Sequence, residues 1–142
     1  MKKLLGFITV LVFSLSSYGQ TGAKIEFKEE TINYGEVVKG EDDGVRIFLF
    51  TNTGDAPLVI SNVKSSCGCT VPSKPTAPIM PGENGEISVK YNMKSGPISK
   101  TITVESNATN KPNGTIPLRI KGNVVVKEVV SPLQKKKTFP NQ

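Results

Sequence analysis

The sequence predicts an all-β protein, a single immunoglobulin-like antiparallel β-sandwich of about seven strands. Three observations support this fold class. Segments of roughly four to eight residues, rich in β-branched and aromatic types, recur between clusters of Gly, Pro, Asn and Asp. Beyond the first 19 residues, no stretch shows the apolar period of an amphipathic helix. About seven strands in about a hundred residues is the count of an immunoglobulin-type sandwich.

Residues 1–19 are predicted to be a cleaved secretory signal peptide. Lys2 and Lys3 form a basic start, Leu4–Leu15 is an apolar run of 12 residues, and Ser17 and Gly19 are small residues at the expected cleavage site. A membrane anchor needs roughly 18 or more apolar residues, so the run favours cleavage after Gly19 and no membrane span in the mature chain. We therefore expect an exported protein, in the periplasm or outside the cell.

The remaining 123 residues are enough for one domain with a single core. We expect the sandwich at residues 20–126 and a basic, flexible tail at residues 127–142, where alternation ends and charge and proline increase. Without the two lysines of the signal peptide the formal charge falls from +6 to +4. The charges outside the tail are mixed rather than gathered in a stripe, so nucleic acid is not an expected partner.

Seven segments have the composition and the flanking turn residues of strands. In chain order the expected strands are Lys24–Phe27, Thr31–Val37, Val45–Thr51, Pro57–Val63, Gly85–Asn92, Ser99–Ser106 and Thr115–Val126.

The later strands show the clearest alternation of apolar and polar residues, which assigns one face of each to the core. The predicted core residues are Ile87, Val89, Tyr91, Ile102, Val104, Ile116, Leu118 and Ile120.

The third strand contains V-R-I-F-L-F, Val45–Phe50, which is apolar on both faces except for Arg46. Such a strand is either covered on both sides or presents its outer face to a partner. Between these alternatives, we expect a loop to cover the second face.

Three turns are explicit in the sequence. Asn52–Pro57 joins two strands, and Gly54 is expected to take a positive φ there. Pro81 and Gly82 are the usual pair of a type II turn. Pro112–Gly114 marks a third reversal before the last strand.

Seven motifs follow one another along the chain: Asn33–Gly40, Phe48–Gly54, Pro57–Ile60, Ser66–Thr70, Pro78–Ile87, Lys100–Asn107 and Leu118–Val124. Together they resemble a widespread family of secreted bacterial proteins of unknown function, whose mark is Cys-Gly-Cys-Thr within an immunoglobulin-like domain. The layout is also similar to Hydin-type and major-sperm-protein domains, which favour an F-x-F-x-N-T-G hairpin. The resemblance covers residues 25–126; it implies a seven-stranded sandwich and secretion, and no known reaction.

The sequence has no histidine, which excludes Ser-His-Asp and Cys-His catalysis and histidine-containing zinc sites. Gly82 and Gly85 precede no helix, so they do not predict a phosphate loop. We therefore expect no enzyme, no catalytic residue, no cofactor and no bound metal. The acidic residues at strand ends and turns are interpreted as solvated charges: Glu29, Glu30, Glu41, Asp42 and Asp43.

Cys67 and Cys69 are the only two cysteines and lie on either side of Gly68. A disulfide between them closes a three-residue loop, worth about 1.6 kcal/mol by loop entropy against about 3 kcal/mol for fifteen residues. In an extended chain, Cα atoms two residues apart lie about 6.6 Å from each other, at the outer limit for a disulfide. Gly68 allows the bend that brings the sulfurs together.

Four interpretations of this pair stay open. The first is a local disulfide that fixes the loop, favoured by an oxidising exterior. The second is two thiols buried or tucked as small apolar residues. The third is a redox pair that exchanges with partner proteins, with a thiolate pKa lowered by Lys64. The fourth is a Cu(I) site with Met80 or Met93 as further ligands.

The sequence favours a secreted, non-enzymatic binding or structural module for an unidentified protein or envelope partner. The expected contacts are the loop at residues 65–75 and the outer face of Val45–Phe50. The alternative is an exported redox-active or Cu(I)-binding protein that works through Cys67 and Cys69. Within the loop, the contact candidates are Ser65, Ser66, Gly68 and Thr70.

Overall fold

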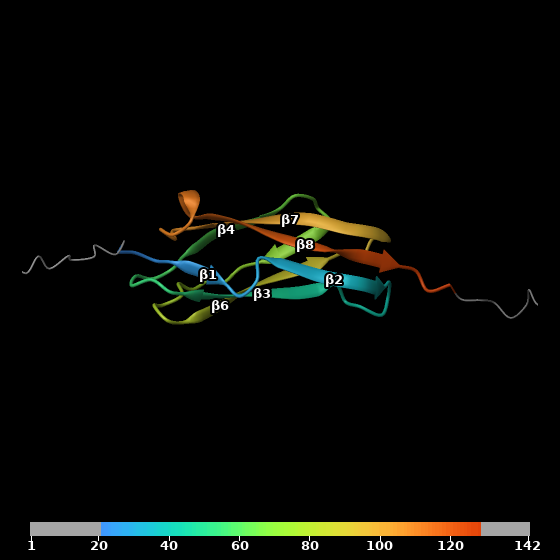
Figure 1. Ribbon diagram of the computed structural model, residues 1–142, viewed down its shortest axis with the longest axis horizontal. Helices are drawn as coiled ribbons and strands as arrows, with labels where there is room; N and C mark the ends of the chain where they lie inside the picture. Colours follow the sequence, from blue (N-terminus) through green and yellow to red (C-terminus); the bar gives the residue numbers. More distant parts are fainter. Residues whose placement is uncertain (1–20, 129–142) are drawn as a thin grey trace, which may run out of the picture.

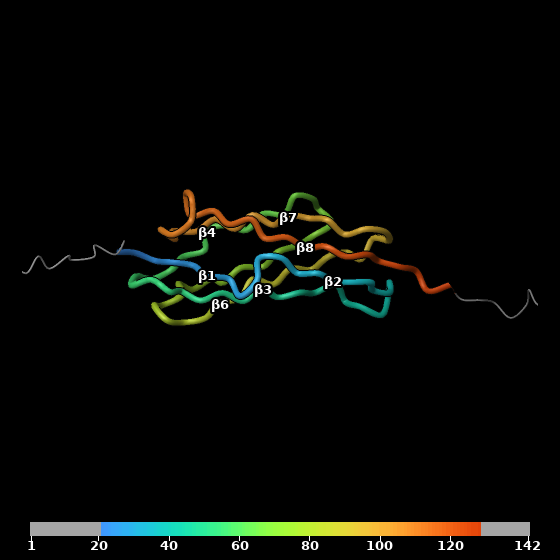
Figure 2. The backbone as a smooth tube through the Cα atoms, viewed as in Figure 1, coloured from blue at the N-terminus to red at the C-terminus, as the bar shows by residue number. Residues whose placement is uncertain are grey.

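The computed structural model describes residues 21–128, which form two four-stranded β-sheets packed face to face (Figure 1). The predicted signal peptide and residues 129–142 of the predicted tail lie outside the described residues. Figure 2 shows the two ends of the described chain at opposite ends of the long axis. The strands are β1 Ile25–Phe27, β2 Thr31–Val38, β3 Val45–Asn52, β4 Ile60–Ser65, β5 Thr70–Ser73, β6 Asn84–Tyr91, β7 Gly96–Ser106 and β8 Thr115–Val125, with the 3-10 turn η1 Pro112–Gly114 before β8.

The strand order is β1-β3-β6-β5 in one sheet and β2-β8-β7-β4 in the other. Neighbours pair antiparallel except β2 and β8, which run parallel. The predicted all-β immunoglobulin-like sandwich is confirmed. Within residues 21–128, no helix has the length and apolar character needed to span a bilayer.

All seven predicted strands are present within a few residues of their expected bounds, and an eighth, β5, was not predicted. It is a short edge strand that contains Pro72. Val71 and Ser73 lie opposite Lys90 and Ser88 of β6 in the positions that exchange hydrogen bonds, as does Cys69, whose carbonyl accepts from Asn92. Pro72 therefore has its missing N–H on the open edge, where a proline is tolerated.

The core lies between the sheets and contains every core residue that alternation predicts. The third strand adds Phe48 and Phe50, and the Phe50 ring centroid lies 5.4 Å from that of Phe27. On the opposite face of β3, Ile47 and Leu49 are 46% and 45% exposed. The expectation that a loop covers this outer face is therefore wrong for the described part of the chain.

Arg46 is the charged residue on the inner face of β3, and it has an aromatic and an acidic partner there. Its guanidinium carbon lies 4.0 Å from the centre of the Tyr34 ring, a cation–π contact. Nη1 and Nη2 donate to the two carboxylate oxygens of Asp42 at 3.1 and 2.8 Å. These hydrogen bonds lower the pKa of Asp42, and the Gly44 N–H adds to the effect. The cluster joins β2 to the start of β3.

Gly82 and Gly54 are needed for different reasons. Gly82 has φ 82°, as the predicted type II turn requires. Gly54 does not have the expected positive φ; instead, a Cβ there would collide with the backbone of Gly22 and Lys24. Glycine at position 54 therefore permits close approach of the residues that lead into β1.

Candidate functional site

The Cys67-Gly68-Cys69 segment carries the chain from β4 in one sheet to β5 in the other. Backbone hydrogen bonds hold it on both sides: Ser66 N–H donates to the Thr101 carbonyl at 3.0 Å, and Asn92 N–H donates to the Cys69 carbonyl at 2.9 Å. Cys67 and Cys69 form a disulfide with Cα atoms 5.3 Å apart. The bond is the one that the first interpretation expects, and a redox pair in its oxidised form contains the same bond.

Thr70 lies beneath this disulfide. Its side chain is 3% exposed, and its Oγ1 lies 3.9 Å from the sulfur of Cys67 and 3.9 Å from that of Cys69. A disulfide sulfur carries no hydrogen, so the hydroxyl is the donor. The Thr70 side chain thus faces the two sulfurs, and a partner contact at Thr70 stays a prediction.

The other contact candidates surround the disulfide on the surface. Ser66 and Gly68 are exposed, and Ser65 is partly buried. The Ser65 hydroxyl oxygen accepts the Cys67 N–H at 3.4 Å, and the Ser66 hydroxyl oxygen accepts the Thr101 N–H at 3.3 Å. Both serines thus order the loop in addition to lying at its surface.

Two of the residues proposed to assist the cysteines, Lys64 and Met80, have other surroundings, and the third, Met93, follows Asn92 in the chain. Lys64 lies on the outer face of its sheet, where its ammonium donates to Glu105 at 2.9 Å and lowers the pKa of that carboxyl. Met80 precedes β6 whereas Cys69 lies beside its far end, about 25 Å away by strand rise. Met93 is buried at 7% exposure. Residues 21–128 contain no cluster of three or more His, Cys, Asp or Glu side chains that could hold a metal.

A second candidate is the outer face of the β1-β3-β6-β5 sheet. Ile47 and Leu49 project from β3, and Val71 projects from β5 with 65% exposure. Between them β6 presents Ser88 and Lys90, which lie opposite Ile47 and Val71 respectively. Apolar side chains are therefore exposed on a central strand, where a free-standing sheet usually alternates to polar residues.

The edge of β3 is also only half paired. Its even-numbered residues bond to β6, because Asn52 N–H donates to Glu83 and Gly44 accepts from Tyr91 in the same register. In an antiparallel strand the odd-numbered residues then face the other neighbour, which is β1. Pairing with β1 ends at Phe27, with one further bond from Lys28 to the Leu49 carbonyl. The backbone N–H and C=O of Ile47 thus face an edge that no strand of the described residues occupies.

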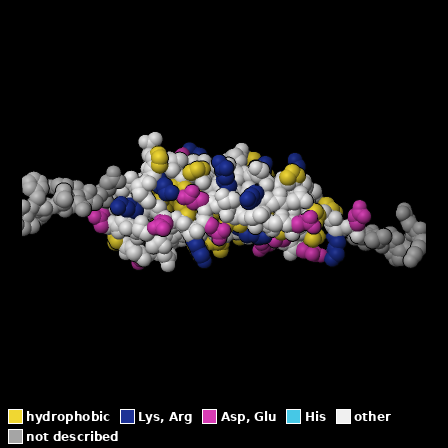
Figure 3. Space-filling view, viewed as in Figure 1, with side chains coloured by type: hydrophobic (Ala, Val, Ile, Leu, Met, Phe, Trp, Pro, Cys, Tyr) yellow, Lys and Arg dark blue, Asp and Glu magenta, His cyan; other side chains and the backbone are white. Residues whose placement is uncertain are grey.

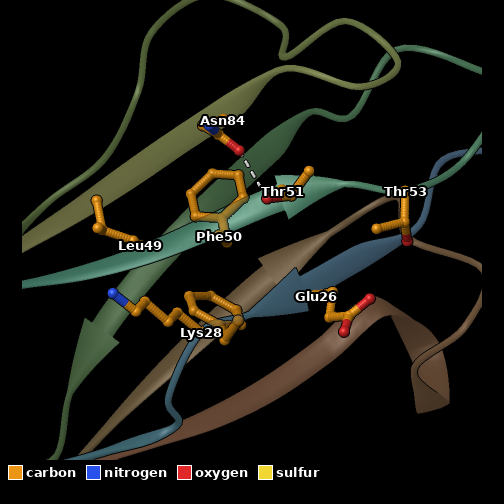
Figure 4. Close-up of a pocket in the computed structure, with 8 residues that line it drawn as sticks. Glu26, Lys28, Leu49, Phe50, Thr51, Thr53 and Asn84 are labelled. Atoms are coloured by element: carbon orange, nitrogen blue, oxygen red, sulfur yellow. Dashed lines mark hydrogen bonds between the residues drawn. The ribbon is translucent and has the colours of Figure 1, made fainter.

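An open groove of about 480 Å³ adjoins Leu49 where β1 meets β3 (Figure 4). Glu26 and Lys28 lie on one side of it, and the Thr51 hydroxyl donates to Asn84 at 2.7 Å on the other. Figure 3 shows acidic and basic side chains interspersed over the face in view, with no continuous stripe of one sign. At the groove, the apolar Leu49 of β3 thus borders one acidic and one basic side chain, Glu26 and Lys28.

Sequence reasoning missed the support role of Thr70 and the half-paired edge at Ile47. The edge had a signal: the first expected strand is about half as long as the third, so one strand cannot cover the whole of the other. For Thr70 the sequence offers no signal except its position next to Cys69, because a pattern of apolar residues does not identify a buried hydroxyl.

Several solved structures share the fold. A protein of unknown function from Porphyromonas gingivalis W83 matches with TM-score 0.63 and 15% identity over 72% of this chain, which spans 47% of that protein, about half its length. The ASH/PapD-like domain 7 of human CEP192 matches with TM-score 0.57 and 12% identity, covering 74% of this chain and 87% of that one. The YadV chaperone matches with TM-score 0.50 and 14% identity, covering 76% and 54%.

At these identities the likeness shows the fold alone, a sandwich of the PapD-like, immunoglobulin-like type. No curated protein matches the chain. The family model described as "Protein of unknown function (DUF1573)" matches residues 25–124, and the chain therefore belongs to this family.

Proposed function

We propose that this chain is an exported, non-enzymatic immunoglobulin-like module that binds an extended segment of a protein partner along β3. One observation carries the proposal. Ile47 combines a side chain that is 46% exposed with backbone groups that face an unoccupied strand position. Exposed strand edges are templates for pairing with another chain, and backbone hydrogen bonds supply affinity in this mode of recognition.

The geometry defines the chemistry of the partner segment. A segment that runs antiparallel to β3, in line with β1, would exchange two hydrogen bonds with Ile47. Its outward side chain would lie beside Ile47 and Leu49, where an apolar residue is favoured. Next to it, Lys28 and Glu26 offer both signs of charge at the groove. We therefore expect an extended apolar segment flanked by charged residues.

Export to the periplasm or the cell exterior is part of the same proposal. It is supported by the basic start, the apolar run and the small residues within residues 1–19. The Cys67–Cys69 disulfide supports it as well, since such bonds persist in oxidising compartments.

Site-specific photo-crosslinking in the native envelope tests the binding surface. A crosslinking residue at Ile47 should yield a discrete protein adduct, and one at Thr103, on the outer face of the other sheet, should not. Ile47→Asp should abolish the adduct formed from position 49. Val59→Asp is the matched control, since Val59 is 42% exposed and lies outside the β3 face. Equal adducts from both sheets, or full binding by Ile47→Asp, would contradict the proposal.

A further inference from the structure

We propose that the Cys67–Cys69 disulfide exchanges with the thiols of a dithiol protein, with Cys67 as the attacked sulfur and Cys69 as the leaving group. This site lies apart from the β3 face and does not depend on partner binding there. The inference rests on three features of the loop: its anchoring, the unequal surroundings of the two sulfurs, and the position of Thr70.

The loop does not need the disulfide to keep its place. The Ser66 and Asn92 hydrogen bonds anchor it to β7 and β6 on either side of the cysteines. The ring closed by the bond spans only three residues, so its removal returns little entropy to the unfolded chain. Reduction should therefore leave the fold intact and the two sulfurs close together, which a reversible exchange site requires.

The two sulfurs are not equivalent. Both cysteines are partly buried, and of the two only Cys69 packs against the hydrophobic core. Gly68, between them, is exposed, and no atom lies within 4 Å of the place that its Cβ would occupy. A thiolate attacks one sulfur and expels the other. An approach from solvent thus reaches Cys67 and leaves Cys69 on the inner side.

Thr70 is placed to stabilise the expelled sulfur. Its buried hydroxyl lies 3.9 Å from both sulfurs, and within residues 21–128 it has no other hydrogen-bond partner. A hydrogen bond to an anionic acceptor is stronger than one to a neutral disulfide sulfur. Low local dielectric strengthens it further. The hydroxyl therefore stabilises the thiolate that bond cleavage releases, which is Cys69 when the attack occurs at Cys67.

The exchange balances in two steps. A partner thiolate attacks Cys67 Sγ, the Cys67–Cys69 bond breaks, and its electron pair passes to Cys69 Sγ while a mixed disulfide forms. The partner's second thiol, once deprotonated, attacks the partner's first sulfur, which is bonded to Cys67 in the mixed disulfide. This step expels Cys67 as a thiolate. The partner is oxidised by two electrons to a disulfide. This chain is reduced to two thiols, which take up the two protons that the partner's thiols released.

Reduction kinetics of the full chain test the proposal, with dithiothreitol as the dithiol probe and alkylation mass as the readout. The native protein should be reduced without loss of its β-sheet circular dichroism and faster than it unfolds. Thr70→Val should slow this reduction about tenfold, as expected for one hydrogen bond in the transition state. Thr70→Ser, which keeps the hydroxyl, should stay near the wild-type rate.

The single-cysteine variants test the asymmetry and retain Thr70, so they remain informative even where Thr70→Val fails to fold. With glutathione disulfide as the probe, Cys69→Ser should form its mixed disulfide at Cys67 at least about tenfold faster than Cys67→Ser forms one at Cys69. Reduction only at the rate of unfolding would overturn the proposal. Equal or reversed rates of the two variants would overturn the assigned order of the sulfurs, and a wild-type rate for Thr70→Val would overturn the role of its hydroxyl.

Discussion

Asn52 shows how much of this fold can depend on one side chain. It is fully buried at the end of β3, and its Nδ2 donates to the carbonyls of Ala56 and Ile79 at 2.8 and 2.9 Å. Its Oδ1 accepts the Gly54 N–H at 3.0 Å and the Lys24 N–H at 3.3 Å. The N-T-G motif therefore joins the start of β1, the β3–β4 connection and the segment before β6.

Replacing Asn52 by alanine removes the side-chain partner of the Ala56 carbonyl and of two N–H groups at once, whereas the Ile79 carbonyl still accepts the Leu58 N–H at 2.8 Å. Each buried polar group left without a partner costs about 1–3 kcal/mol. Asn52→Ala should lower the free energy of unfolding by about 3 kcal/mol, measured by urea denaturation. Asn123→Ala, at a partly exposed position of β8, is the control and should change it by less than about 0.5 kcal/mol. Equal effects at the two positions would show that the motif is not a structural anchor.

Tyr34 couples stability to alkaline pH. Burial raises its pKa to about 12, and its hydroxyl donates to the Gly44 carbonyl at 2.8 Å. In the unfolded chain a tyrosine has a pKa of about 10. Because the folded pKa is the higher one, the contribution is fully present below about pH 10 and is lost as the pH rises towards 12.

Urea denaturation at pH 8, 10 and 11 checks this expectation. The free energy of unfolding should fall more steeply above pH 10 in the wild type than in Tyr34→Phe. At pH 8 the variant should lose only about 1 kcal/mol, because the Gly44 carbonyl also accepts the Tyr91 N–H at 3.0 Å and keeps a partner. Parallel pH profiles would assign the alkaline loss to other groups.

Among the elements, the β4–β5 connection contributes less to stability than its disulfide suggests. The loop is held by backbone hydrogen bonds at Ser66 and Cys69, and the covalent ring is short. The double variant Cys67→Ser, Cys69→Ser should therefore keep a cooperative thermal transition and lose no more than about 2 kcal/mol in urea denaturation. If the double variant fails to fold, the disulfide is required for folding, which would contradict this prediction.

The elements also show what local sequence can predict. Alternation identifies the later strands because residues such as Ile87, Val89 and Tyr91 share one face of a strand and enter the core. Apolar residues therefore recur at every second position of the sequence. Alternation does not identify β5, which has four residues, contains Pro72 and is a strand only through its pairing with β6. Edge pairing is a tertiary property, and no period in T-V-P-S encodes it.

The same limit applies to the candidate site. The two cysteines and the apolar outer face of β3 were visible as composition and pattern. The burial of Thr70 and the match of Arg46 with Tyr34 and Asp42 were not, because they depend on which loops meet at the ends of the strands. Sequence thus located the loop and the face, whereas the contacts that give each its chemistry came from the structure.

At the scale of the whole molecule, each sheet is assembled from distant parts of the chain. β2 pairs with β8, so that sheet is complete only when strands from near both ends of the described chain are in place, and the other sheet joins β1 and β3 to β6 and β5. The long central pairs β3–β6 and β7–β8 form the middle of the two layers. Amide exchange should accordingly be slowest in these pairs and fastest in the edge strands β1 and β5.

Within β3, exchange should also alternate between neighbouring residues. The Phe48 N–H faces β6 and should be protected by the central pairing, whereas the Ile47 N–H faces the unoccupied edge and should exchange much faster. Amide exchange by NMR on the purified full chain measures both in one experiment. Protection of Ile47 equal to that of Phe48 would mean that the edge is covered in the isolated protein. Fast exchange that slows only when the partner is added would place the partner strand on β3.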